Sequence, residues 1–364
     1  MASTTFTARI AAGLAGTLLL TGLSLAVGAP TASADVANGL GYETVPAQPY
    51  QGNPDSADWV GSYLVGGAQV WCVQFAYKAP DSDEQYQPGE TLKTKWGTEL
   101  PADVAADISY LLLRYAGTTS PDEAAALAHL LHTWTSGPQS PDQLDPGNDF
   151  RTIAYDENFH FTKLPAGAQD AVGTLKSDAA ANRGPWTATV TAPTKPQVIG
   201  TADTWTAQVL GASGMGVGKV PVSITLTDAT LADGKAETSA PTPDDGSPIS
   251  LAVTPTGPNP SVAISLTAPA AVPVVQQALE VDTQKIVSTG GEDTLTANAA
   301  ATATPAPTPT VPKTIPAGEP AVAEAAASGQ NTTGIAGVIA LAALGTLLIA
   351  TSLVRRRRHH AEHR

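Results

Sequence analysis

The stretch Ala68-Gln-Val-Trp-Cys-Val-Gln-Phe-Ala-Tyr77 decides the fold class of the N-terminal half of this 364-residue chain. Its residues alternate between two faces, one with Val70, Cys72 and Gln74 and the other with Trp71, Val73 and Phe75. A two-residue period predicts a β-strand. Tyr63-Leu-Val65 precedes it and predicts a second strand, so a small sheet is expected here.

Two helices are predicted after this sheet. The first begins near Pro101, and its apolar residues recur with helical spacing at Val104, Ile108, Leu111, Leu112 and Tyr115. The second begins at Ser120-Pro-Asp-Glu123, which combines an N-cap serine with the glutamate of a capping box. Its apolar stripe comprises Ala124, Leu127, Ala128, Leu131 and Trp134. Because a short loop joins the helices, we predict a helical hairpin on a small sheet, an α+β domain over residues 35–185.

Residues 186–300 have a different texture. Segments 186–191, 203–210, 220–227, 249–254 and 261–267 alternate apolar residues with Ser and Thr, and Gly, Pro and Asp clusters separate them. This spacing of short strands predicts an all-β antiparallel sandwich, with 284–288 and 293–296 as closing strands. Gly218-Lys-Val-Pro-Val-Ser-Ile-Thr-Leu226 and Asp244-Asp-Gly-Ser-Pro-Ile-Ser-Leu251 resemble the immunoglobulin-like or prealbumin-like spacer domains of bacterial adhesins.

The two ends of the chain predict export and membrane anchoring. Residues 1–34 contain Arg9, an apolar run and Ala32-Ser-Ala34, as expected for a cleaved signal peptide. Residues 301–333 are rich in Ala, Pro and Thr and predict a disordered, extended stalk. Residues 334–354 are uncharged and long enough for one transmembrane helix, and the basic tail 355–364 would stay cytoplasmic. The predicted location is therefore the cell membrane, with the N-terminus outside.

The C-terminal arrangement resembles that of sortase substrates on Gram-positive, actinobacterial-type surfaces. The segment in the position of a Leu-Pro-x-Thr-Gly signal is Ala325-Ala-Ala-Ser-Gly329, with Ala for Leu and Ser for Thr. A clear signal is thus absent, and we expect retention by the membrane helix.

Charge and cysteine content exclude several classes of function. Residues 35–333 carry 13 basic and 32 acidic side chains, a field that repels nucleic acid. Cys72 is the chain's only cysteine, so no internal disulfide can form. No Cys/His set of metal-site spacing is present, and neither a metal nor a cofactor is predicted.

The surroundings of Cys72 resemble the thioester domains that head Gram-positive surface adhesins. Trp71-Cys72-Val73 matches the aromatic-Cys-aliphatic strand of that family, and Trp134 matches a tryptophan on a facing helix. The resemblance implies an internal thioester between Cys72 and a glutamine, able to capture host nucleophiles. The glutamine position falls near Leu130, which has no carboxamide. The head is therefore interpreted as a degenerate thioester domain that has lost this chemistry.

A cysteine amidase or peptidase directed at the cell wall is the alternative, with Cys72 as nucleophile and His132 or His160 as base. His160 lies in the alternating segment Asn158-Phe-His-Phe-Thr162. Against both chemistries stands a buried Cys72 that packs as a small hydrophobe, which we favour. His129 and His132 are expected to face solvent.

Trp59, Trp71 and Trp96 are candidate platforms for a sugar ring, although core tryptophans are equally common. Together these features favour a non-enzymatic, adhesin-type display protein, with its head raised on a spacer and stalk to meet a host or cell-wall ligand. A purely structural coat protein is the other alternative. The sequence does not indicate the oligomeric state.

Overall fold

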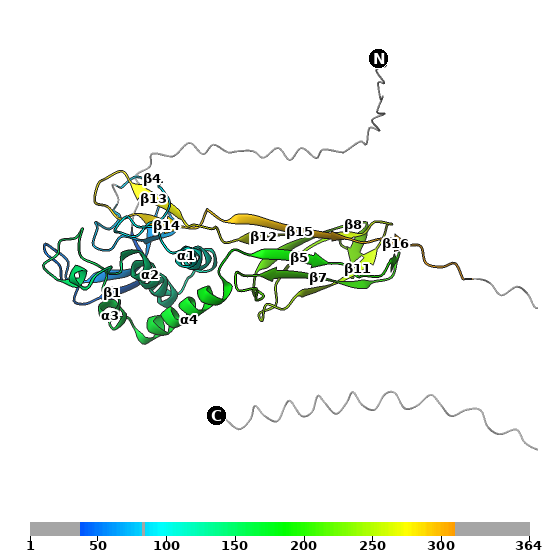
Figure 1. The fold of residues 1–364 in the computed structure, drawn as a ribbon, viewed down its shortest axis with the longest axis horizontal. Helices are drawn as coiled ribbons and strands as arrows, with labels where there is room; N and C mark the ends of the chain where they lie inside the picture. Colours follow the sequence, from blue (N-terminus) through cyan, green and yellow to red (C-terminus); the bar gives the residue numbers. More distant parts are fainter. Residues whose placement is uncertain (1–36, 82–83, 310–364) are drawn as a thin grey trace, which may run out of the picture. The chain divides into compact units, whose positions relative to one another are not determined.

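The computed structural model describes residues 37–81 and 84–309 (Figure 1). The predicted signal peptide, membrane helix and basic tail, and the stalk beyond residue 309, lie outside the described residues. Within the described ranges, no helix has the length and apolar character needed to cross a membrane.

The N-terminal part contains a six-stranded sheet of order β1-β2-β3-β14-β13-β4. Its strands are β1 (Ala37–Thr44), β2 (Asp58–Val65), β3 (Ala68–Cys72), β4 (Tyr86–Pro88), β13 (Val274–Ala278) and β14 (Ile286–Ser288). Gly66 and Gly67 connect β2 to β3, both with positive φ. A two-residue hairpin turn needs that conformation, which glycine adopts without strain. The predicted strands around Tyr63 and Cys72 are thereby confirmed as a tight hairpin.

Four helices of the described residues belong to this head: α1 (Ala102–Tyr115), α2 (Pro121–Ser136), α3 (Glu157–Phe161) and α4 (Ala166–Asn182), with a 3₁₀ turn at Pro141–Leu144. The predicted start of α2 is confirmed, because the Ser120 side chain accepts a hydrogen bond from the Glu123 amide. α2 contacts β1, β2 and β3 as well as α1 and α4, so it is buried on nearly every side. The α+β class predicted for the head is therefore confirmed.

The segment around His160 is helical although its residues alternate. Glu157–Phe161 forms the short helix α3. Asp156 caps this helix by accepting a hydrogen bond from the Phe159 amide. A local side-chain cap therefore prevails over a two-residue alternation that is too short to specify a strand.

Residues after 186 form two four-stranded antiparallel sheets, of order β10-β8-β12-β15 and β5-β7-β11-β9. The strands are β5 (Thr187–Thr191), β7 (Asp203–Leu210), β8 (Pro221–Thr227), β9 (Ala229–Leu231), β10 (Glu237–Pro241), β11 (Ile249–Pro255), β12 (Ser261–Ala268) and β15 (Asp293–Ala300). A further short parallel pair joins β6 (Gln197–Val198) to β16 (Ala303–Thr304). Alternate residues are buried along β7, β8, β11 and β12, for example Val222, Ile224 and Leu226 on β8. The predicted antiparallel strands over 187–268 are confirmed.

One predicted closing strand lies elsewhere. β15 pairs with β12 along its whole length, as expected for a closing strand. Residues 286–288, by contrast, form β14, which pairs with β3 of the head, with Ile286 opposite Cys72. The chain therefore leaves the β-sheets after β12, completes the head sheet with β13 and β14, and returns as β15 (Figure 1). The expectation that 284–288 closes the sandwich was wrong, because local pattern does not specify a strand's partner.

Candidate functional site

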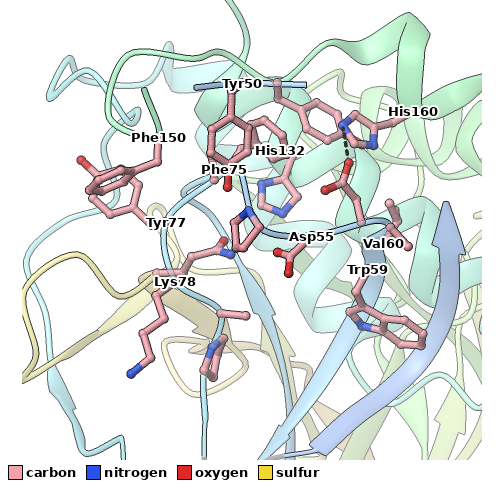
Figure 2. Close-up of a pocket in the computed structure, with 18 of the residues that line it drawn as sticks. Tyr50, Asp55, Trp59, Val60, Phe75, Tyr77, Lys78, His132, Phe150 and His160 are labelled. Atoms are coloured by element: carbon pink, nitrogen blue, oxygen red, sulfur yellow. Dashed lines mark ion pairs between the residues drawn. The ribbon is translucent and has the colours of Figure 1, made fainter. Parts of the chain in front are cut away.

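A cavity of about 760 Å³ opens in the head beside β2 (Figure 2). Its wall combines three kinds of side chain. Aromatic rings come from Tyr50, Trp59, Tyr63, Phe75, Tyr77, Phe150 and Tyr155; carboxylates come from Glu43, Asp55, Asp58 and Asp282; and nitrogen or amide groups come from Lys78, His132, His160 and Gln284. A concave site that combines aromatic rings with a few polar groups is typical of a ligand site.

Tyr155 lies between two buried histidines at the rear of this cavity. Its ring stacks on His160 at 4.2 Å between centroids and on His132 at 5.2 Å. Burial lowers the pKa of His132 to about 3 and that of His160 to about 2. Burial likewise lowers the pKa of His129 to about 4, while its Nδ1 lies 2.9 Å from the Tyr155 hydroxyl. All three imidazoles are therefore neutral at pH 7.

The prediction that His129 and His132 face solvent was wrong. Both are buried, because α2 packs against the sheet on one side and against α4 and α1 on the other. The apolar stripe used for the prediction describes one face only, whereas α2 buries residues around its circumference.

Gln48 and Asp58 fix the position of His160. The His160 Nε2 atom lies 3.0 Å from the Gln48 Oε1 acceptor, so Nε2 carries the proton and Nδ1 holds a lone pair. Nδ1 is buried and has no hydrogen-bond partner among the described residues. Asp58 Oδ2 accepts a hydrogen bond from the backbone N–H of Gln48 at 2.6 Å and lies 3.8 Å from His160 Nε2. Burial raises the pKa of Asp58 to about 6.

Lys95 is a buried amine that ties together three loops near the same cavity. Its Nζ donates to the carbonyls of Phe75, Phe150 and Ile153 at 2.8, 2.8 and 2.6 Å. Burial lowers the pKa of Lys95 to about 7. Three carbonyl acceptors match the three hydrogens of an ammonium group, whereas a neutral amine has only two, so we treat Lys95 as charged at pH 7. Its donors are all used, and its role is to hold these loops.

Cys72 is fully buried at the end of β3. It packs with Tyr63, Val70 and Ile286, with Tyr86 against the same cluster. Burial raises the pKa of the Cys72 thiol far above its usual range, and neither a histidine nor a cation contributes to the shift. The neighbouring Trp71 donates from its indole nitrogen to the Ala124 carbonyl of α2, so the alternate residue Cys72 points away from α2 and its His132. The geometry does not pair the thiol with an imidazole base.

Gln284 is the residue that reasoning from the sequence missed. β14 is antiparallel to β3 with Ile286 opposite Cys72, and the Val73 amide donates to the Lys285 carbonyl at 3.0 Å. Gln284 precedes Ile286 by two residues and so lies on the same face as the thiol, at the diagonal position. Diagonal neighbours of an antiparallel pair are within reach of long side chains. The Gln284 side chain is buried and lines the cavity, and its Oε1 has no hydrogen-bond partner in the described part of the chain.

Tyr86 contacts both Gln284 and the cluster that contains Cys72. Its hydroxyl donates to the backbone carbonyl of Gln284 at 3.1 Å, and its ring packs on the cluster of Cys72. The other nearby carboxamide, Gln74, is already engaged, since its Oε1 accepts a hydrogen bond from the Lys285 amide. The helical position near Leu130 that the sequence suggested for a glutamine is occupied by that buried leucine. The signal in the sequence was Thr283-Gln-Lys-Ile-Val287, a strand-like segment with no local indication of its partner.

The three candidate tryptophans occupy different environments. Trp59 is partly exposed and lines the cavity, with its indole nitrogen donating to the Ser62 carbonyl. Trp71 is fully buried, so it belongs to the core and cannot serve as an exposed sugar platform. Trp96 is partly buried, and its indole nitrogen donates to the Gly137 carbonyl away from the residues that line the cavity.

Among known proteins, similarity to this chain was found only in solved structures. No protein-family model and no curated protein match the chain. The chain is structurally similar to the Bacillus anthracis TIE protein, with 12% identity and a TM-score of 0.36 over 75% of this chain and 49% of that one. It is similar to the thioester domain of the Staphylococcus aureus TIE protein, with 13% identity and a TM-score of 0.36 over 75% of this chain and 99% of that domain. This chain thus spans about half the length of the B. anthracis protein.

Proposed function

We propose that this protein is a surface-displayed binding protein whose head joins Cys72 and Gln284 in an internal thioester. The observation that carries the proposal is a buried carboxamide with an unpartnered Oε1, placed two residues before Ile286, the β14 residue that pairs with the buried Cys72. Display is supported by the signal peptide, stalk and membrane helix that the sequence predicts.

The bond-forming step balances without another reagent. The Cys72 sulfur attacks the Gln284 carboxamide carbon, the C–N bond breaks, and the amide nitrogen leaves as ammonia with the thiol proton. A primary amine on a partner would then attack the thioester carbonyl, which forms an amide to Gln284 and returns the Cys72 thiol. Since the cavity reaches Gln284, a partner group can approach the acyl carbon from the cavity side.

Burial of the thiol is compatible with this chemistry. A permanently buried thiol is a poor nucleophile toward external substrates, because the neutral form prevails. An internal reaction with one fixed neighbour gains instead from proximity and exclusion of water. The cysteine amidase is not favoured, because the thiol has no histidine base beside it and points away from α2.

Intact mass spectrometry of the exported chain tests the proposal. A thioester lowers the mass by about 17 Da relative to the sequence, and the thiol should react with iodoacetamide only after methylamine treatment. Gln284→Ala and Cys72→Ser should each abolish the deficit. Gln74→Ala is the matched control, because it removes the nearest other carboxamide from the same region and should retain the deficit.

Far-UV circular dichroism of each variant checks that the head still folds. A native-like wild-type chain without a mass deficit would overturn the thioester and leave Cys72 as an apolar core residue. Loss of the deficit in Gln74→Ala but not in Gln284→Ala would overturn the assignment of Gln284.

A further inference from the structure

The cavity contains more negative charge than its own cations neutralise. Lys78 is the lysine in its wall, and its Nζ lies 2.9 Å from Asp81 and 3.1 Å from Glu280. Asp282 is likewise paired, with Arg151 at 2.5 Å. Glu43, Asp55 and Asp58 remain, and none of them forms an ion pair with a lysine or arginine among the described residues.

Asp58 is the most constrained of these carboxylates. Its side chain is 15% exposed, and the nearest ionisable nitrogen is His160 Nε2 at 3.8 Å. That imidazole is neutral, since burial lowers its pKa to about 2. The charge of Lys163 lowers the pKa of Asp58 without forming an ion pair with it, so a ligand cation in the cavity would further offset the cost of removing this carboxylate from water. Figure 2 shows the Asp55 carboxylate directed into the cavity, and Asp58 belongs to the same wall.

Two further acceptors in the wall are short of donors. His160 Nδ1 holds a lone pair, and Gln284 Oε1 is a carbonyl oxygen; both are buried, and neither has a hydrogen-bond partner within the described ranges. Aromatic faces make up much of the remaining wall, with Tyr50, Phe75, Tyr77 and Phe150 grouped on one side (Figure 2). Aromatic faces attract cations and the methylene stems that carry them. Carboxylates, unpartnered acceptors and aromatic rings all favour a positively charged hydrogen-bond donor.

We infer that this cavity binds, noncovalently, a lysine or arginine side chain presented by a partner protein. This inference deepens the proposed function and rests on its claim that the head binds a partner, but it does not depend on the thioester. A volume of about 760 Å³ accommodates a long basic side chain with its flanking residues. Asp55 and Asp58 would contact the cationic group, and the aromatic wall would cover its methylene stem. Specificity comes from charge, because a neutral ligand leaves the partly buried Asp58 carboxylate without an ion-pair partner.

Isothermal titration calorimetry with the whole Cys72→Ser chain tests this inference without any covalent reaction. The probes are a trilysine peptide, the same peptide with acetylated side chains, and chitotetraose. We expect trilysine to bind and the acetylated peptide and the sugar not to bind. Asp55→Asn with Asp58→Asn should weaken trilysine binding by about tenfold or more, since the pair removes two negative charges from the cavity and one of them, Asp58, is only 15% exposed.

The matched control is Asp233→Asn with Asp244→Asn, which removes the same charge from exposed carboxylates in the turns on either side of β10. This pair should change the affinity less than about twofold. An equal loss in both pairs would reduce the effect to general attraction toward an acidic protein and overturn the inference. Binding of chitotetraose, or equal binding of the acetylated peptide, would overturn it in favour of a neutral ligand. Since Cys72→Ser cannot form a thioester, trilysine binding here is independent of the mass deficit that tests the proposed function.

Discussion

Acidification should destabilise the head through its three buried histidines. Their folded-state pKa values of about 4, 3 and 2 lie below the 6.5 of the unfolded chain. The unfolded chain therefore binds protons that the folded head does not. The stability present above pH 6.5 is lost as the pH falls from 6.5 toward the folded-state pKa values. From pH 7 to pH 5, each histidine should cost about 2 kcal/mol of unfolding free energy.

Asp58 acts in the opposite direction. Its folded-state pKa is raised to about 6, so the folded head binds a proton before the unfolded chain does. Asp58 should therefore raise the unfolding free energy by about 1 kcal/mol between pH 7 and pH 5. The net loss from pH 7 to pH 5 is about 4 to 5 kcal/mol, which is a large fraction of the stability of an ordinary domain.

Urea denaturation of the wild type and of His132→Leu, each at pH 7 and pH 5, measures this effect. His132 is suitable because its Nδ1 has no hydrogen-bond partner among the described residues, so the main interactions that leucine removes are the ring contacts with Phe75 and Tyr155. The substitution should reduce the loss between the two pH values by about 2 kcal/mol, whatever its effect at pH 7. Equal losses in the wild type and the variant would refute the reasoning. Asp58→Asn is the opposite control and should increase the loss.

Three further substitutions test the packing and capping of the head, each by urea denaturation at pH 7. Lys95→Met should lower the unfolding free energy by about 3 kcal/mol or more, because three carbonyls lose their donor, and a loss below about 1 kcal/mol would contradict that role. Trp71→Ala should cost about 4 kcal/mol, since the ring is fully buried against α2; a neutral effect would argue against this core. Ser120→Ala should cost about 1 kcal/mol through the lost N-cap, and no change would show that the Glu123 amide finds another acceptor.

Local features of the structure were predictable because their signals are local. Ser120 and Glu123 specify the start of α2 through hydrogen bonds within one turn. The alternation of Val222, Ile224 and Leu226 specifies a strand with one buried face. The order of a helix-containing head followed by antiparallel sheets follows from such segments alone.

The candidate site was only partly predictable. Cys72 and Trp71 were correctly placed on opposite faces of one strand, because strand alternation is a local property. Burial of His129 and His132 was missed, since it depends on α4 packing on the side of α2 opposite the sheet. Gln284 was missed for the same kind of reason, because nothing near it in the sequence indicates that it lies beside Cys72.

The sequence by itself determined which segments are helices or strands, the apolar character of both chain ends and the presence of a single thiol. These features depend on residue type and on the spacing of a few positions. Tertiary structure alone decided that β14, which follows the strands of the antiparallel sheets in the sequence, pairs with β3 of the head, with Ile286 opposite Cys72. The physical reason is that strand pairing at a separation of more than 200 residues is set by the fit of buried side chains across the completed sheet. That pairing brings a thiol, a carboxamide and an acidic aromatic cavity together in one head.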